Sequence, residues 1–527
     1  AEAHGCADLQ ARRGNIAQQV HETPFWLEAF ASWFQPLHPA CARIEISPGW
    51  LRAMWSADLW NRFNVWAVYF VLAALVALGV GGIVAMVYAW LYMDGFSFLR
   101  IVLVFGGIVS SVCMLQRRRR AHTQRLRLNE VRARNTDGHP PGTQVVMGFR
   151  RQSFTWTAEH IPGHVLDNWQ QKTDAADTHF RQGMGVEEFE RNFGDLAAMP
   201  DWVDWDLLEK GCSFFVQVWP FIFFGFSWAL LAGFGAETAS AVLLKSRYWA
   251  AQGDTGRLDT WKRLRETACW LHDVAMHGSS GFIPGGVSWK ACMRVRYLHC
   301  RTRATIWKSG GWDKEKYGEP INQVQIIGTL LGSSVLLLNG MEELAGVSLP
   351  TEKKEAFIHL WRVIGFLFGI EEELNPNRSA DRAQVVLESV FTHGIPEFPD
   401  ESLTAVLTKH ICESVALGIR TEFGAPVTAG MVGVSAWYFV GPSYGKAIGL
   451  PEASWHGHLI GFARRCMLRF VLLLYLLLPG ASFVFDPMMR YLFSAMACSI
   501  RKRQPQCRFG VACPVSGSAQ GVCPGKA

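Results

Sequence analysis

The sequence predicts an all-α protein, in which an N-terminal transmembrane helical hairpin precedes a large helical domain. Hydrophobic residues make up 50% of the 527 residues and charged residues only 18%, a balance typical of chains with membrane-embedded sequence. Residues 64–93 contain no charged side chain. From about residue 145 to residue 490, apolar residues recur with helical period, without alternating strands or hairpin signals.

Residues 1–60 form an aromatic-rich arm that contains Trp26, Trp33 and Trp50 among other rings. Tryptophan favours the boundary between membrane and water, because its ring is apolar and its N–H stays hydrated. An interfacial amphipathic helix fits this composition, and so does a peripheral helix packed on a partner protein. The sequence begins with Ala1, which we interpret as the result of a removed targeting segment or a trimmed terminus.

Residues 61–120 are expected to form the hairpin. About 20 apolar residues cross a hydrocarbon core at a rise of ~1.5 Å per residue, so residues 64–93 suffice. Asp94 and Gly95 end this run, and the second run, residues 96–115, holds one charge, Arg100, near its start. Four arginines follow at residues 117–120 and predict that this side faces inward, even if the second run lies in the membrane plane.

The predicted location is therefore an integral membrane position in contact with the lipid bilayer. The mitochondrial inner membrane with a matrix-facing domain is favoured, with a plastid membrane or a bacterial inner membrane as alternatives. The net charge of +6 is spread thinly, and no nucleic-acid-binding motif accompanies it. Nucleic acid is therefore not expected as a partner.

Residues 121–144 are a polar linker with a Gly- and Pro-rich break at residues 137–142, and residues 145–490 form the predicted helical domain. Two apolar stretches in this domain have two interpretations each. Residues 214–234 are uncharged and fit either a third membrane span or a central helix buried on all sides. Residues 470–478 are too short to span and fit a core helix or a membrane-resting one.

The tail, residues 491–527, is rich in cysteine, glycine and proline. Most of the thirteen cysteines occur singly in apolar stretches and are interpreted as small buried residues. No paired CxxC zinc pattern occurs. Cys498, Cys507, Cys513 and Cys523 cluster in the tail, where a loosely ordered segment with free or paired thiols is favoured over two disulfides or a metal knuckle.

Arg263, Glu266, Thr267 and Trp270 share one face of a predicted helix. A surface face of salt bridges with one buried tryptophan explains this pattern, and so does the polar wall of a pocket. His299 lies in a second predicted helix, with Arg296 at i−3 and Arg303 at i+4 on the same face. A lone histidine in such a place is usually a core residue, but neutral imidazole also binds iron, and arginines pair with carboxylates in forked geometry.

A third block predicts a helix N-terminus, with Pro320 in its first turn followed by Asn322 and Gln323. Together the blocks resemble the latex-clearing (rubber) oxygenases and the fungal endoplasmic-reticulum oxygenases that cleave a farnesyl chain in mycophenolic acid biosynthesis. The resemblance covers roughly residues 145–490 and rests on the following residues: Pro200, residues 201–205, Gly211, Pro284, Gly285, Gly286, Trp289, Arg294, Arg296, Leu298, His299, Arg303, Pro320, Ile321, Asn322, Gln323, Trp361, Arg362, Gly365, Gly369, Ile370, Gly441, Pro442, Gly449, Leu450 and Pro451.

The resemblance implies an all-α domain that binds haem b, with His299 as the proximal iron ligand and Arg296 and Arg303 beside the propionates. It also implies that residues 214–234 are a core helix. Arg263 and Thr267 match an arginine and a threonine of the family's distal pocket. Glu266 departs from the rubber-cleaving members, which have a lysine there, and no match is found for their glutamate base. An acid at this position would serve in proton transfer or pair with Arg263.

The expected function is that of a haem-dependent oxygenase acting on an apolar isoprenoid or lipid substrate. The alternative is a non-catalytic accessory subunit of an organellar membrane complex that retains the oxygenase fold and contacts partner proteins. A haem-based gas or redox sensor ranks third, because no output domain is recognisable.

Overall fold

The computed structural model describes residues 161–178, 180–181, 183–193, 198–246, 253–345, 348–395, 401–477 and 481–503. The predicted arm, hairpin and linker, and the tail beyond residue 503, lie outside these residues. In the described part every regular element is a helix, which confirms the all-α prediction for this part of the chain.

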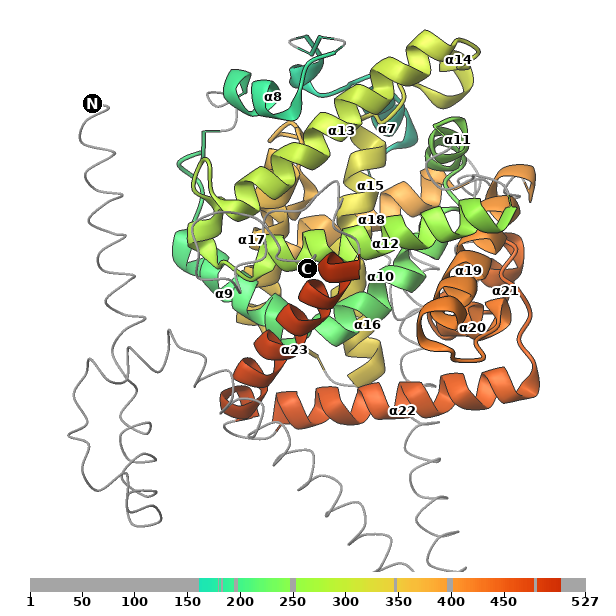
Figure 1. Ribbon diagram of the computed structural model, residues 1–527. Helices are drawn as coiled ribbons and strands as arrows, with labels where there is room; N and C mark the ends of the chain where they lie inside the picture. The colour runs from blue at the N-terminus through green and yellow to red at the C-terminus, as the bar shows by residue number, and fades with distance from the viewer. Residues whose placement is uncertain are drawn as a thin grey trace, which may run out of the picture. The chain divides into compact units, whose positions relative to one another are not determined.

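The helices follow one another in this order (Figure 1): α7 Gly163–Gln170, η4 Ala175–Thr178, α8 Val186–Asn192, α9 Trp205–Gln217, α10 Trp219–Gly233, α11 Glu237–Lys245, α12 Gly253–Ala275, η5 Ser279–Phe282, α13 Val287–Ser309, α14 Lys314–Tyr317, α15 Gln323–Ser333, α16 Val335–Ala345, α17 Thr351–Leu367, η6 Pro376–Arg378, α18 Ala380–Gly394, α19 Glu401–Phe423, α20 Ala429–Val440, α21 Pro442–Ala447, α22 Trp455–Leu477 and α23 Ala481–Arg503.

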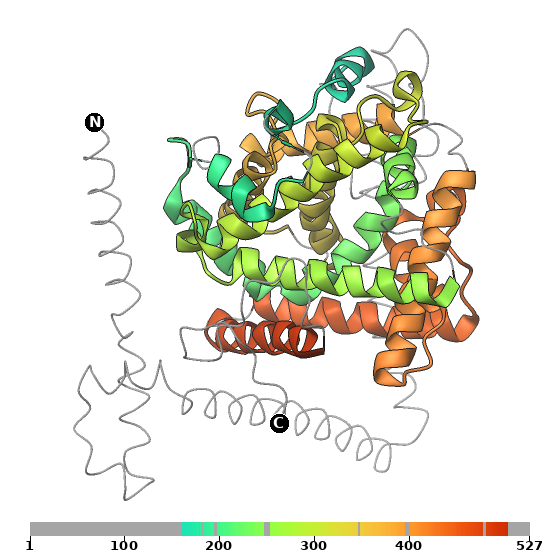
Figure 2. The same cartoon turned by 45° about the horizontal axis from the view of Figure 1, so that its top comes forward.

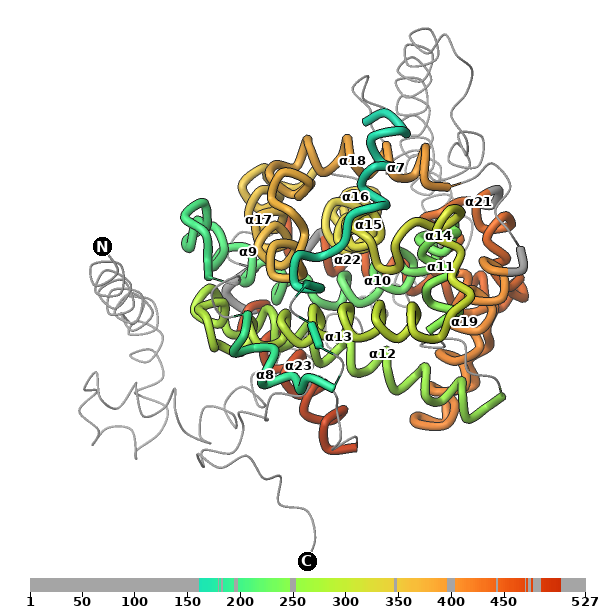
Figure 3. Tube along the Cα trace, turned by 90° about the horizontal axis from the view of Figure 1, so that it is seen from above, coloured from blue at the N-terminus to red at the C-terminus, as the bar shows by residue number. Residues whose placement is uncertain are grey.

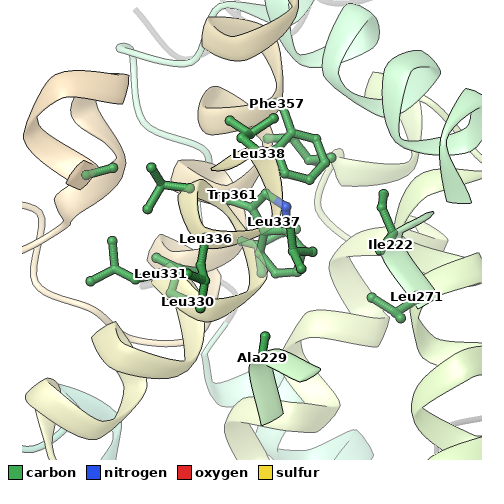
Figure 4. Close-up of a cluster of buried hydrophobic side chains, with 14 of the residues drawn as sticks. Ile222, Ala229, Leu271, Leu330, Leu331, Leu336, Leu337, Leu338, Phe357 and Trp361 are labelled. Carbon is green, nitrogen blue, oxygen red and sulfur yellow. The ribbon is translucent and has the colours of Figure 1, made fainter. Parts of the chain in front are cut away.

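The core is apolar and draws on helices that are distant in sequence. Figure 4 shows Ile222 from α10 and Leu271 from α12 near leucines of α15 and α16 and the rings of α17. Where two helices approach closely, small residues make room. A Cβ atom at Gly211 of α9 would lie 2.3 Å from the carbonyl oxygen of Ala356 in α17, so only glycine permits this contact.

Residues 214–234 do not form one helix. Helices α9 and α10 meet at Val218 with a bend of 83°. Pro220 lies in the first turn of α10, where its missing N–H and fixed φ favour a new helix start over continuation of the old one. Phe215, Ile222 and Trp228 are all buried, so both helices contribute to the core, as the resemblance implied, although the helix is broken.

Among the described residues, the stretch Gln323–Ala345, which joins α15 and α16, is long and apolar enough to cross a bilayer, and α9 with α10 qualifies only if the bent pair counts as one span. In the stretch Gln323–Ala345, 72% of the most apolar window is buried inside the protein. Burial of this extent is typical of core helices.

Helices α12 and α13 are long neighbours, joined through η5, and they carry the predicted site residues (Figure 3). Helix α23 packs against α12 on the far side from α13 (Figure 2). Helix α23 continues past residue 490, where the sequence analysis placed the end of the helical domain, and ends at Arg503.

Candidate functional site

His299 lies in the middle of α13, a helix of 23 residues that ends at Ser309 and is followed by Gly310, whose φ of 68° suits glycine. The His299 ring is partly exposed, but its Nδ1 atom is sealed from solvent and has no hydrogen-bond partner in the described part of the chain. Burial lowers the pKa of His299 to about 4, assisted by the charge of Arg303 and opposed by that of Asp174. The imidazole is therefore neutral near pH 7, the form that binds metal.

Arg296 makes a buried, two-bond ion pair. Its Nε donates to Oδ2 of Asp174 at 2.6 Å, and its Nη2 donates to Oδ1 of the same carboxylate at 2.5 Å. Both side chains are almost fully enclosed. This forked geometry is the strong form of an arginine–carboxylate pair.

Arg303 is held in a similar way, seven residues further along α13. Its guanidinium pairs with Asp177 and donates to the carbonyl oxygens of Pro320 at 2.9 Å and Ile321 at 2.7 Å. The two arginines therefore bind carboxylates of the segment that runs from α7 into η4. These contacts do not exclude other acceptors, because each guanidinium has five N–H donors.

The stretch from Pro320 to Gln323 keeps this segment in place. Asn322 caps α15 with a capping box that includes Gln325, so a helix does begin at this block, but the prediction that Pro320 lies in its first turn is wrong, because Pro320 precedes the cap. The Gln323 side chain donates to the carbonyl oxygens of Thr173 and Gly369 at 3.2 Å and 2.9 Å. A block that resembled only a helix start therefore also positions the carboxylates that bind the arginines.

On α12, Glu266 is 2% exposed, so it does not belong to a solvated face of salt bridges. Arg263 and Thr267 are partly buried, and the Thr267 hydroxyl donates to the Arg263 carbonyl oxygen at 3.1 Å. A carboxyl group buried on this face agrees better with the polar wall of an internal site than with a surface.

Phe368, just after α17, connects the two helices that carry the candidate residues. Its ring lies 5.7 Å from the ring of Trp270 on α12 and 5.8 Å from the ring of His299 on α13. The Trp270 N–H also donates to the carbonyl oxygen of Ala291 on α13 at 3.2 Å. Thr267 lies one turn before Trp270 on α12. The candidate residues of α12 and the candidate residues around His299 on α13 therefore lie on two adjoining helices.

Two pockets of about 240 Å³ each lie elsewhere. One is lined by Asp254, Arg257, Glu413 and Arg420, and the other includes His164 and His393. Within the described ranges, no group of three or more histidine, cysteine or acidic side chains is arranged to hold a metal ion.

Four residues of this region were missed by sequence reasoning: Asp174, Asp177, Phe368 and the positioning role of Gln323. The two aspartates are one helical turn apart, and the two arginines are two turns apart, so their pattern on its own is that of an ordinary polar surface. Pairing across more than 100 residues leaves no local signal.

The fold is thus an all-α domain in which a neutral histidine lies on a long internal helix. Residues 215–470 match the family model described as ER-bound oxygenase mpaB/B'/Rubber oxygenase, catalytic domain. The resemblance to the latex-clearing and rubber oxygenases is therefore confirmed for this part of the chain.

Two relatives illustrate the likeness. The rubber oxygenase of Streptomyces sp. (strain K30) is 26% identical over 260 residues, which make up 48% of this chain and 58% of that protein. The alignment thus spans less than two thirds of the relative's length. A solved structure of latex clearing protein in the closed state covers 66% of this chain and 94% of that one, with 21% identity and a TM-score of 0.42.

The residues around His299 fit a haem in their donor chemistry. Neutral imidazole on a helix would hold the iron, and the sealed Nδ1 is a polar atom that the described residues do not satisfy. Arg296 lies one turn before His299 and Arg303 lies one turn after it, and each arginine pairs with one aspartate. Propionates beside them would share the guanidinium groups with Asp174 and Asp177 or displace these carboxylates.

Proposed function

We propose that the protein is a membrane-anchored, haem b-dependent oxygenase that acts on an apolar isoprenoid or lipid substrate, with His299 as the axial ligand. The observation that carries this proposal is the neutral His299, placed within the part of the chain that matches an oxygenase catalytic domain. The predicted hairpin at residues 61–120 supports membrane anchoring, since an apolar substrate would reach the domain from the bilayer.

Each residue has a defined part in this proposal. His299 would hold the haem, which supplies the site of dioxygen activation. Arg263 would donate hydrogen bonds into the site, and Thr267 would contribute its hydroxyl group. Glu266, buried on the same helix, would hold or deliver a proton, because a carboxyl group away from water exchanges protons with few competing acceptors. Phe368 would keep the His299 ring in one orientation.

The test is haem retention by His299→Ala. The purified variant is expected to lose its Soret absorbance while its helical circular dichroism stays unchanged. His359→Ala is the matched control, because His359 is also a buried helical histidine whose Nε2 accepts a hydrogen bond, from the Asp204 N–H. Stoichiometric haem in His299→Ala would overturn the assignment, and restored haem binding in His299→Gly on addition of imidazole would support it.

A second candidate is a non-catalytic subunit of an organellar membrane complex. The ion pairs of Arg296 and Arg303 favour this candidate. Each arginine of α13 has an aspartate as its partner within the protein, so neither needs a cofactor to balance its charge. Spectra of the wild-type protein separate the two functions. A Soret band that shifts with carbon monoxide after reduction supports the oxygenase. Purified protein without a Soret band, recovered at a fixed ratio within a larger complex, supports the subunit.

A further inference from the structure

Helix α22, Trp455–Leu477, is amphipathic, and only one of its sides is covered by the described protein. It runs along the base of the domain as drawn in Figure 1. Its inner side packs against α16, α20 and α23 and buries Leu468, Leu472 and Tyr475. The opposite side has no neighbour among the described helices that conceals its large apolar residues.

This outer side exposes a continuous apolar surface, which we call the α22 face and define by Trp455, Leu459, Ile460, Phe462 and Met467. Their exposed fractions are 68%, 58%, 53%, 57% and 58%. The spacing 455, 459, 462 follows the i, i+3, i+4 rule of one helical stripe, and exposed Cys466 continues it. Single exposed apolar residues are common, but a stripe of this length marks a surface that is covered in the working protein.

Two arginines in the middle of α22 turn away from this face. Arg464 donates to the Ser435 hydroxyl, and its guanidinium lies 5.0 Å from the ring centroid of Phe224. Arg465 pairs with Glu343 at 3.5 Å and donates to a backbone carbonyl of α20. Because both positive charges are directed inward, the α22 face carries no charge between residues 459 and 467.

The charge at the margins indicates what covers the face. Helix α22 contains no aspartate or glutamate, and His456, His458 and Arg469 are exposed beside the apolar stripe. An apolar stripe with basic margins and no acidic residue is typical of helices that lie in the surface of an anionic membrane. A protein interface would more commonly show a polar rim of both charge signs.

The rest of the chain brings a membrane within reach. Residues 64–93 are uncharged and are predicted to span a bilayer, and only residues 116–160 separate the hairpin's second apolar run from the described domain. A tether of this length keeps the domain at a high effective concentration beside the bilayer. Even a weakly apolar surface would then associate with lipid.

We propose that α22 lies in the plane of a lipid bilayer, with the α22 face inserted among the acyl chains and its basic margin at the headgroups. The helix is ~35 Å long at a rise of ~1.5 Å per residue, so it would fix the orientation of the domain as well as its distance from the membrane. This proposal rests on the membrane anchoring of the proposed function, but it does not depend on haem or on any activity at His299.

The full-length protein is reconstituted at one copy per vesicle in phosphatidylcholine with phosphatidylglycerol and a phosphatidylcholine that carries a diazirine in its acyl chain. After irradiation, mass spectrometry locates the labelled peptides. We expect label in residues 455–469 and in residues 64–93. Label in residues 64–93 without label in α22 would overturn the proposal, because it would show a membrane-anchored protein whose domain does not touch lipid.

Leu459→Asp combined with Phe462→Asp is expected to reduce the α22 label about tenfold or more. Each substitution removes a large apolar side chain that would otherwise be buried among the acyl chains. Trp307→Asp is the matched control, because Trp307 is 42% exposed near the end of α13, apart from the α22 face. Unchanged label in the double variant would contradict the proposal. Rapid modification of Cys466 in vesicles by a membrane-impermeant maleimide would also contradict the proposal. That result would show that lipid does not cover the α22 face, and a second copy of the chain or a protein partner would then be its occupant.

Discussion

Arg296 and Asp174 form the most enclosed ion pair at the candidate site, with two hydrogen bonds of 2.6 Å and 2.5 Å and side chains that are 6% and 1% exposed. The pair joins the helix that carries His299 to a segment 122 residues earlier in the chain. Removal of water from both charges makes the pair rigid and makes the loss of either partner costly.

Loss of the Asp174 charge is expected to destabilise the protein strongly. Asp174→Asn leaves a buried guanidinium without its carboxylate, which costs about 3–5 kcal/mol. Glu371→Gln is the control, because Lys172 and Glu371 pair at 2.6 Å from the same segment but are 48% and 37% exposed. Such an exposed pair contributes about 1 kcal/mol or less. Equal losses in urea denaturation of the two variants would contradict this account.

Gly369 permits the close approach of Asp174. Substitution of Gly369 should therefore also destabilise the protein, because it displaces the Asp174 carboxylate from Arg296. Its φ is 86°, and an added Cβ atom would lie 2.3 Å from the Asp174 carboxyl carbon. Gly183, with φ of 93° and no atom within 4 Å of an added Cβ, is the control. Gly183→Ala is expected to cost about 1–2 kcal/mol from backbone strain alone. Gly369→Ala should cost more, as measured by thermal unfolding, because Asp174 must also move.

Helix α23 makes a buried ion pair with α12 in addition to its apolar contacts. Arg501 pairs with Asp273 of α12, and both are nearly enclosed, whereas Arg503 pairs with Glu422 at 2.6 Å and is 49% exposed. Arg501→Ala is expected to increase hydrogen exchange throughout Ala481–Arg503, because the buried Asp273 carboxylate then keeps only its contact with His272 Nδ1, at 3.2 Å, and the contact with α12 weakens. Arg503→Ala should leave the exchange of this helix nearly unchanged. Equal exchange in both variants would show that apolar packing alone holds α23.

The low pKa of His299 predicts a dependence of apoprotein stability on pH. The folded pKa is about 4 and the ordinary value is 6.5, so the unfolded chain binds more protons between these values. Stability should therefore be complete above pH 6.5 and fall as the pH approaches 4, by at most about 3 kcal/mol from this residue. His299→Gln should flatten this part of the profile. His277, His359 and His410, whose pKa values are also lowered by burial, remain in both proteins.

Local patterns predicted local structure well. The block from Pro320 to Gln323 was recognised as a helix start, although its cap is Asn322 and Pro320 lies before the helix, and α12 and α13 follow from helical period. The family resemblance identified the domain because its blocks are spaced along the whole of it. Each of these signals lies within a few turns of one helix or in the order of such segments.

Non-local pairing was not predictable in the same way. The arginines beside His299 were recognised, but their partners Asp174 and Asp177 lie 122 and 126 residues away. The bend at Val218 was also missed, although Pro220 is its local cause. A proline in an uncharged stretch is compatible with a kinked span, a break or a first turn, and packing decides among them.

The long separation between Asp174 and Arg296 also governs the order of events on the ribosome. At roughly 5–20 residues per second, the codons between the two positions take about 6–24 s to translate, so the acidic segment emerges well before its basic partner exists. During that interval the apolar side chains of α9 and α10 are already made and unprotected. The contact between the acidic segment and α13 therefore forms only after α13 has left the exit tunnel.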